Sequence, residues 1–420
     1  MDPAPAQLLE PAAPWANPIV WLCRKRLSRG FWTFFTAALF FDFGFAVYFF
    51  LFNLYLLDLH FNERAIGWIT GALTLGSVAG TLPAGLFARR FGIRHILIAC
   101  FIAAPILGAV RALVISEPLQ IGAAFLAGVA MCLWGVCFLP TVAGLTTEHN
   151  RASGFSLIFS TSIGTSALGG AICGYLPQWL AHAGFTLQSI EVKRLILLVS
   201  CAIAALGLFA VLKMPQTQTE QQTPAQDWRR LLKLSPFLLR FLPRMALWTA
   251  ALACFTPFAN IYLARELHIP FARIGLIFSA SQIIQFCAGL FTPAIFRKLG
   301  LLRGIVATQF LTAATLACLA GTHHAALAIA LYLGFSALQW MSSPGLYNLV
   351  MSGVPEHERS TAASMTLFSN AILQSIATVA AGSLFVRFGY PHVLTGIACT
   401  AAIVALLFRS LPAPAETPTP

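Results

Sequence analysis

Charge is scarce in this chain. Asp, Glu, Lys and Arg make up only 10% of its 420 residues, whereas 58% of the residues are hydrophobic. Soluble globular domains average about 25% charged residues. The shortage of charge therefore excludes an ordinary soluble protein and indicates a membrane protein.

The signatures of catalysis and metal binding are missing as well. The ten Cys lie mostly inside apolar segments and lack the paired spacing of a metal site. The nine His lie in loops or at the ends of these segments, and no nucleophilic triad or phosphate-binding loop is present. We therefore expect no enzyme activity, no metal, no cofactor and no ATP site.

Long apolar segments fill most of the chain. A helix of about 20 apolar residues spans a bilayer, whereas the strands of a membrane barrel are shorter and alternate in polarity. Twelve segments meet the helix criterion, at roughly 32–57, 66–88, 95–115, 119–145, 153–176, 192–212, 243–264, 273–296, 303–322, 325–353, 361–385 and 391–410. The predicted fold class is an all-α membrane protein with 12 transmembrane helices.

An internal repeat relates the two halves of the chain at a constant offset of 208 residues. Leu and Ala matches carry little information in so apolar a chain, but the repeat also matches polar residues and glycines. The matches include Leu59-His60 with Leu267-His268, Ile66-Gly67 with Ile274-Gly275, Gly92 with Gly300, Glu148-His149 with Glu356-His357, and Gly174 with Gly382. Such a repeat predicts two pseudo-symmetric six-helix bundles with a solute site between them.

The net charge of +12 is explained by the uneven distribution of Lys and Arg between the two sides of the membrane. It does not indicate nucleic-acid binding. With an even number of spans both termini lie on the same side, and 19 of the 26 Lys and Arg residues fall on that side. Loops rich in Lys and Arg face the cytoplasm. We expect a multi-pass protein of the cell inner membrane with both termini cytoplasmic and no nucleic-acid partner.

Polar segments divide the chain into domains. We predict a cytoplasmic N-terminal segment (1–30), two six-helix bundles (31–213 and 242–411), a cytoplasmic linker (214–241) and a disordered tail (412–420). This plan resembles the major facilitator superfamily, and the resemblance covers the whole chain outside its ends. It implies transport by alternating access, in which a central site opens to each side of the membrane in turn.

The loop after the second span supports this resemblance with one departure. The family pattern reads roughly Gly-x-Leu-Ala-Asp-Arg-x-Gly-Arg-Arg, and it is matched here at Gly85, Ala88, Arg90, Gly92 and Arg94. Arg89 stands where the family has an Asp that helps to lock the cytoplasmic ends of the two halves. The usual form of that lock is therefore absent.

Asp42 is the one acid that falls well inside a predicted span. It lies about ten residues into the first span, roughly 15 Å deep at 1.5 Å per residue. An ionised carboxylate at such a depth costs about 2.5–3.5 kcal/mol, so acids there usually face the protein interior and serve function. We predict a role in proton coupling or substrate contact. A structural hydrogen bond to a neighbouring helix is the alternative.

Polar side chains at helical spacing extend the predicted site. Asp42, Ala46, Phe49 and Asn53 share one face of the first span, and Thr249, Ala253, Thr256 and Asn260 share one face of the seventh. The predicted proton or substrate site consists of Asp42, Asn53, Asn260, Gln282, Gln285, Asn370 and Gln374, with Gln339 and Asn348 as weaker candidates. The alternative for each residue is pairing with a neighbouring helix.

Small residues predict close helix contacts. The second span contains Gly76-x-x-x-Gly80 and the fifth Gly170-x-x-x-Gly174, and glycines let helix backbones approach closely. The resemblance implies that spans 2 and 5 face spans 11 and 8 of the other half. Packing within one half is the alternative.

The altered lock predicts a charge-reversed cytoplasmic gate, closed when the cavity opens outward. Basic loops of each half would bind acidic loops of the other: Arg89, Arg90, Arg297 and Lys298 on one side, Glu148, Glu356 and Glu358 on the other. The alternative is that the acids pair locally with Arg151 and Arg359 and cap their helices.

These features predict a monomeric secondary active transporter that binds a small molecule and protons within the lipid bilayer. The leading prediction is proton-coupled export, by an antiporter, of a rather apolar neutral or cationic compound. Uptake or facilitated diffusion of a small polar metabolite is the alternative within transport. A non-transporting membrane sensor or scaffold is the alternative outside it.

Overall fold

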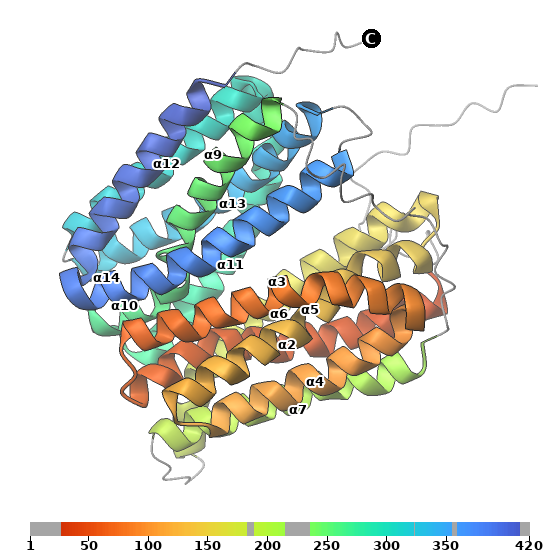
Figure 1. Ribbon diagram of the computed structural model, residues 1–420. Coiled ribbons are helices and arrows are strands. Elements are labelled where there is room, and N and C mark those ends of the chain that lie inside the picture. The colour runs from red at the N-terminus through yellow and green to blue at the C-terminus, as the bar shows by residue number, and fades with distance from the viewer. Residues whose placement is uncertain (1–26, 183–188, 215–235, 323, 355–358, 412–420) are drawn as a thin grey trace, which may run out of the picture.

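The computed structural model describes residues 27–182, 189–214, 236–322, 324–354 and 359–411, and its regular elements are all helices. They form two bundles that meet at one end of the molecule and diverge toward the other (Figure 1). The first bundle comprises α2 (Arg29–Asp58), α3 (Glu63–Phe91), α4 (Ile93–Leu113), α5 (Glu117–Leu145), α6 (Glu148–His182) and α7 (Ser189–Leu212).

The second bundle begins with a broken helix, made of α9 (Pro236–Ala253), the 3₁₀ turn η1 (Thr256–Phe258) and α10 (Ala259–Arg265). It continues with α11 (Phe271–Leu299), α12 (Leu301–Gly321), α13 (Ala325–Ser352) and α14 (Arg359–Arg409). Gly389, with φ 74° and ψ 168°, divides α14 into two legs. With each leg counted as one span, the 12 predicted spans and the two six-helix bundles are confirmed. Residues 215–235, most of the predicted linker, lie outside the described residues, as do 1–26 and 412–420.

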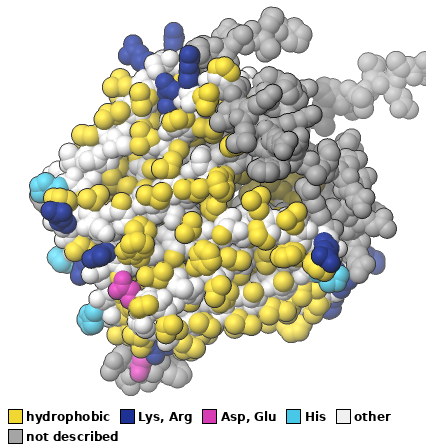
Figure 2. Space-filling view, in the orientation of Figure 1, with side chains coloured by type: hydrophobic (Ala, Val, Ile, Leu, Met, Phe, Trp, Pro, Cys, Tyr) yellow, Lys and Arg dark blue, Asp and Glu magenta, His cyan; other side chains and the backbone are white. Residues whose placement is uncertain are grey.

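The two ends of the molecule differ. We call the end with the loops at 58–63, 265–271 and Gly389 the closed face, and the end with the turns at Gly92 and Gly300 the open face. The surface between them is largely apolar, with charged side chains toward the ends (Figure 2). Helices of this length and hydropathy can cross a membrane.

Backbone geometry explains part of the repeat. Gly92 and Gly300 begin α4 and α12 with φ of 84° and 83° and ψ of 149° and 151°, a combination that is open essentially only to glycine. His60 and His268 also share positive φ, of 64° and 49°. The matched residues therefore build matched turns, because each bundle needs the same change of direction between the same helices.

The bundles touch near the closed face through two related helix pairs, α3 with α14 and α6 with α11. A Cβ on Gly382 would lie 2.3 Å from the carbonyl oxygen of Glu63, and a Cβ on Gly275 would lie 2.5 Å from that of Gly170. Buried hydroxyls of the second bundle reinforce both contacts: Ser375 donates to the carbonyl of Gly71 at 2.7 Å, and Ser279 donates to the carbonyl of Ala167. Glycine is required here for close approach of the backbones.

One of the two predicted glycine pairs lies between the bundles, and the other packs within one bundle. Gly170 and Gly174 lie against Gly275 of α11, across the interface between the bundles. Gly76 and Gly80 instead pack on α5, against Phe125 and Cys132, within the first bundle. The motif therefore marks close helix packing in both places and bundle contact in only one.

Toward the open face, the same helices separate. Exposed apolar side chains on them include Leu86 and Phe87 of α3, Leu290 and Phe291 of α11, and Phe368 of α14. The bundles are therefore in contact at the closed face and apart toward the open face.

We predict that Gly275→Val weakens the closed face. The added side chain meets backbone atoms of Gly170 and Gly174, and overpacking costs about 1–3 kcal/mol, enough to redistribute conformations that differ by a few kcal/mol. Spin labels at Arg64 and Arg273, both exposed near the interface, should move apart. Gly289→Val, on the same helix with open space at its Cβ, is the control and should leave the distance unchanged. Equal distances in the two variants would contradict the prediction.

Candidate functional site

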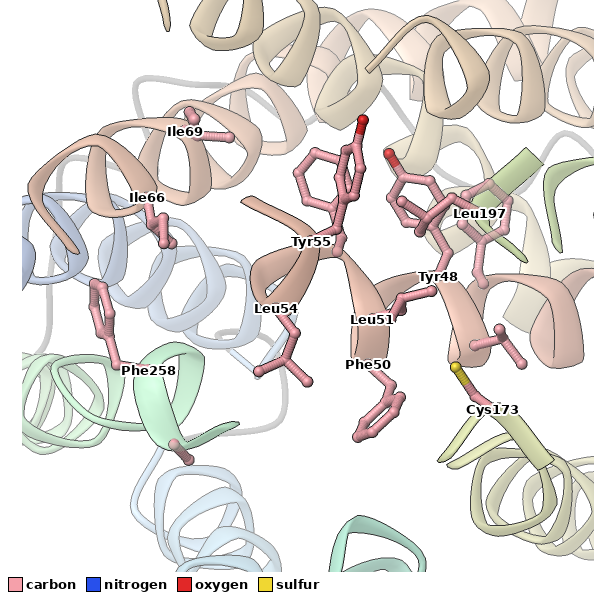
Figure 3. Packing of buried hydrophobic residues seen from close by; sticks show 14 of the residues in the cluster. Tyr48, Phe50, Leu51, Leu54, Tyr55, Ile66, Ile69, Cys173, Leu197 and Phe258 are labelled. Atoms are coloured by element: carbon pink, nitrogen blue, oxygen red, sulfur yellow. The ribbon is translucent and has the colours of Figure 1, made fainter. Parts of the chain in front are cut away.

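The site is organised by the break between α9 and α10. Pro257 has no N–H to give to the carbonyl of Ala253 four residues earlier, and the Thr378 hydroxyl of α14 donates to that carbonyl at 3.3 Å instead. Phe258 of the break packs into the buried cluster that also contains Ile66 of α3 (Figure 3). The predicted span at 243–264 is therefore present but interrupted at 254–258, where proline removes a helical bond and a hydroxyl of another helix replaces it.

A cavity of about 240 Å³ lies between the bundles beside this break. Four predicted site residues line it: Asn53 from α2, Asn260 from α10, and Gln282 and Gln285 from α11. The weaker candidate Gln339 lines it as well. The lining also includes Thr256, Ser281, Tyr332 and Ser336, and the aromatic side chains of Phe49, Phe50, Phe278, Phe335 and Trp340.

The two asparagines bind across the interface. The Asn53 amide donates to the carbonyl of Pro257 at 2.8 Å, and the Asn260 amide donates to the carbonyl of Phe50 at 3.3 Å. Each side chain thus satisfies a backbone acceptor of the other bundle. They form the closed-face floor of the cavity, and they leave amide oxygens able to accept further hydrogen bonds.

The cavity combines several polar groups with a mostly apolar surface. None of the described residues that line it is charged, and five of them carry amides. The Gln339 side-chain oxygen accepts from Thr256 at 3.3 Å, and Tyr332 hydrogen-bonds with Ser336 and Ser281. An ion entering this cavity would be desolvated without a counter-charge, which is unfavourable. The arrangement suits a neutral solute with several hydrogen-bonding groups.

Asp42 lies outside this cavity. It sits between α2 and α6 in a narrow space lined by Phe35, Leu39, Thr161 and Ser162, among others, and it is partly buried. Its carboxylate hydrogen-bonds with Ser162. Along α2 it precedes Phe49, on the same face, by seven residues, or roughly 10 Å at 1.5 Å per residue. It therefore lies on the open-face side of the cavity.

Three other candidates do not reach the cavity. Asn370 is buried in α14, and its side-chain oxygen has no partner among the described residues. Gln374, one turn further on, is partly buried but does not line the cavity, and Asn348 of α13 is exposed away from it. Helical spacing identified the polar face of each helix. It could not show at which position along the helix that face lines the cavity.

The sequence analysis missed three residues of α13. Tyr332, Ser336 and Trp340 line the cavity from this helix beside Gln339. Their spacing of four, seven and eight residues places them on one helix face. That spacing was a usable signal, although only Gln339 was recognised as a candidate.

Charged contacts close the face beyond the cavity floor. Arg265 of α10 binds the buried Glu63 of α3 at 2.6 Å, and the Tyr390 hydroxyl of α14 lies 3.4 Å from the same carboxylate. On the other interface, Lys193 of α7 binds Asp58 at 2.6 Å and lies 5.0 Å from the ring centroid of Phe271. Positions 63 and 271 are related by the repeat, and each is contacted by a Lys or Arg side chain of the opposite bundle.

Five of the predicted gate residues lie at the open face. Arg90, Arg151, Arg297, Lys298 and Arg359 are exposed there, and Arg359 donates to the carbonyl of Met351 at 3.2 Å. Glu356 and Glu358 lie outside the described residues, as do the side chains of Arg89 and Glu148. The gate therefore stays a prediction.

Comparison with known proteins identifies the class. The family model of the Major Facilitator Superfamily matches residues 34–378, so the chain belongs to this superfamily. It is a multi-pass membrane transporter, and its family is one of transporters rather than enzymes.

Solved structures support the same fold. The nucleoside transporter NupG is similar with a TM-score of 0.75 and 15% identity, over 91% of this chain and 98% of that one. A D-xylose-proton symporter gives a TM-score of 0.74 at 14% identity, over 92% and 98%. The inward open conformation of the xylose transporter XylE from E. coli gives 0.68 at 16% identity, over 93% and 97%. A search of curated proteins found no match.

Proposed function

We propose that this transporter carries a small neutral solute rich in hydrogen-bonding groups, such as a polyhydroxylated or glycosidic metabolite. The observation that carries the proposal is the lining of the cavity, which combines five amides with hydroxyls and aromatic faces and includes no charged residue among those described. Its volume of about 240 Å³ is below the ~300–1,000 Å³ of pockets for drug-sized ligands.

This proposal follows the second transport prediction rather than the first. Asn53, Asn260 and Gln339 already hydrogen-bond within the protein. An apolar compound would leave the remaining polar atoms of the cavity amides without partners, and a buried polar group without a hydrogen bond costs about 1–3 kcal/mol. A cationic compound would find no carboxylate among the described lining residues. The titles of the similar structures name nucleoside and xylose transporters, which is consistent with a neutral polar solute.

The open face is the cytoplasmic one in this proposal. It bears Arg90, Arg94, Arg297, Lys298 and Arg303, and loops rich in Lys and Arg remain in the cytoplasm. The arrangement is then inward-facing, with Arg265 and Glu63 near the outer surface. Opening outward would require this ion pair and the two asparagine bonds to break.

We further propose that Asp42 couples transport to protons. It lies on the open-face side of the cavity, and its hydrogen bond to Ser162 joins two helices of the same bundle. A carboxyl between moving helices can take up a proton on one side of the membrane and release it on the other as its surroundings change. The same hydrogen bond is equally what a structural Asp would make, so the test must separate the two roles.

The substrate site is tested by Gln282→Leu. Loss of one amide from an uncharged cavity should raise the KM for a neutral polyhydroxylated solute by roughly tenfold, the loss expected for about one hydrogen bond left unmade. Uptake into proteoliposomes is measured against a panel of neutral, anionic and apolar solutes. Asn348→Leu, an exposed position outside the cavity, is the control. Binding without flux would favour a sensor, and preference for an apolar compound would restore the export hypothesis.

Proton coupling is tested by Asp42→Asn. We expect the variant to lose accumulation driven by a pH gradient yet keep solute exchange between equal concentrations, because exchange needs no net proton movement. Ser162→Ala removes the hydrogen-bond partner while leaving the carboxyl, so it should retain coupling. Accumulation by Asp42→Asn at the wild-type level would remove Asp42 from the mechanism. Loss of exchange as well, together with lower thermal stability, would assign it a structural role.

The charge-reversed gate remains part of the proposal. Each exposed ion pair contributes only about 0–1 kcal/mol, but several together can bias two states a few kcal/mol apart. Arg89→Ala should increase the fraction of molecules open to the cytoplasm, measured from label distances across the open face. The control is Arg94→Ala, because the Arg94 guanidinium binds the Leu212 carbonyl of its own bundle. An Arg89→Ala distribution equal to that of the wild type would exclude the gate.

A further inference from the structure

A second cavity lies on the outer surface of the C-terminal bundle, apart from the solute cavity. Its volume is about 480 Å³, and it is formed by α9 and both legs of α14. The lining residues are Leu247, Ala250, Ala251, Cys254, Leu384, Phe388, His392, Val393, Gly396, Ile397 and Thr400. None of them lines the cavity between the bundles. We call it the α9–α14 groove.

The groove faces away from the other bundle. Gly382 of α14 contacts α3, and Leu384 lies two residues, or about 200°, further around that helix. Leu384 and Phe388 are 41% and 49% exposed, although they lie in a membrane-spanning helix. Their exposed surface therefore meets the lipid bilayer.

The groove is open because several of the residues that line it have small side chains. Ala250 and Ala251 come from α9, and a Cβ added at Gly396 would meet no atom within 4 Å. The Thr400 hydroxyl donates to the carbonyl of Gly396 at 2.9 Å, so its polar group is satisfied within its own helix. The groove is consequently an open apolar surface over most of its length.

One end of the groove is cationic. His392 lines it, and the His392 Nδ1 atom lies 3.0 Å from the carbonyl oxygen of Phe388. That contact makes Nδ1 the donor, so Nε2 of the neutral ring accepts hydrogen bonds and does not donate them. The exposed Arg387 places its guanidinium 5.2 Å from the ring centroid of Phe388. Arg387 forms no ion pair with a residue that the structure describes.

The dimensions match half of a bilayer. From His392 to Thr400 the second leg of α14 rises eight residues, roughly 12 Å, and a hydrocarbon leaflet is about half of the ~30 Å bilayer core. The cationic end lies next to Gly389, at the closed face, where lipid head groups begin. An apolar groove one leaflet long with an arginine at the head-group level is complementary to an anionic amphiphile.

We propose that the α9–α14 groove binds a phospholipid of the closed-face leaflet, with an acyl chain along α9 and the phosphate on Arg387. Arginine suits this role because its guanidinium can bind phosphate oxygens through two parallel hydrogen bonds. The inference rests on membrane insertion and does not depend on which solute is carried.

Native mass spectrometry of the full chain, titrated with phosphatidylglycerol, tests the proposal. The wild type should bind one lipid more tightly than the rest. Gly396→Leu should remove that site by filling the groove, and Arg387→Gln should weaken it roughly tenfold, as expected for one charge-assisted hydrogen bond. The matched controls are Gly122→Leu and Arg273→Gln, an exposed glycine and an exposed arginine elsewhere near the closed face. Both should bind as the wild type does.

Two further probes separate the hydrocarbon and phosphate contributions. Diacylglycerol, which lacks the phosphate, should bind more weakly than phosphatidylglycerol and should not distinguish Arg387→Gln from the wild type. Inorganic phosphate should not displace the lipid, because it cannot fill the groove. Wild-type lipid affinity in both Gly396→Leu and Arg387→Gln would overturn the proposal. Because Arg387 is exposed, its variant keeps the test valid even if Gly396→Leu fails to fold.

Discussion

The structure depends on how closely two pairs of helices approach at the closed face. Gly67 lies against Gly382, and Gly275 against Gly170 and Gly174, with backbone atoms where any larger side chain would stand. Hydrocarbon gives no hydrophobic drive for helices to associate, so such contacts depend on close packing and on hydrogen bonds. The hydroxyls of Ser375 and Ser279 supply those bonds. The rest of the interface is arranged around these two contacts.

Away from water, every backbone N–H and C=O group needs a hydrogen-bond partner within the protein. This requirement explains the contacts at the cavity floor. The break at Pro257 frees carbonyls that a continuous helix would have paired. Thr378 binds one of them and Asn53 binds another, so the second bundle's irregular backbone is held partly by its own bundle and partly by the other. These bonds tie the shape of the cavity between the bundles to the contact of the bundles at the closed face. A solute that competes for the Asn53 amide therefore acts on the same bond that holds the bundles together.

Much of the architecture could be predicted from the sequence because it rests on local requirements. Span lengths follow from bilayer thickness, and Gly92 and Gly300 repeat because both turns need positive φ. The break in the seventh span could not be predicted in this way, since Pro83, Pro105 and Pro293 lie inside helices that continue. What distinguishes Pro257 is a hydroxyl on α14, distant in sequence, that replaces the lost bond. Likewise, spacing along α2 placed Asp42 and Asn53 on one face, but only packing decides that Asn53 binds the η1 turn and Asp42 lies against α6.

The repeat also shows where the two bundles have diverged. Asp42 corresponds to Ala250, and its partner Ser162 corresponds to Asn370, each at the offset of 208. The first bundle therefore has a carboxyl where the second has a methyl group and an unpartnered amide oxygen. Conversely, the solute cavity draws only Phe49, Phe50 and Asn53 from the first bundle and the rest of its lining from the second. Two copies of one fold thus supply different chemistry, a titratable group on one side and neutral hydrogen-bonding groups on the other. Both connect to the closed-face floor through α2, so in the proposed mechanism movement of that one helix relative to α6 and α10 would link protonation of Asp42 to release of the solute.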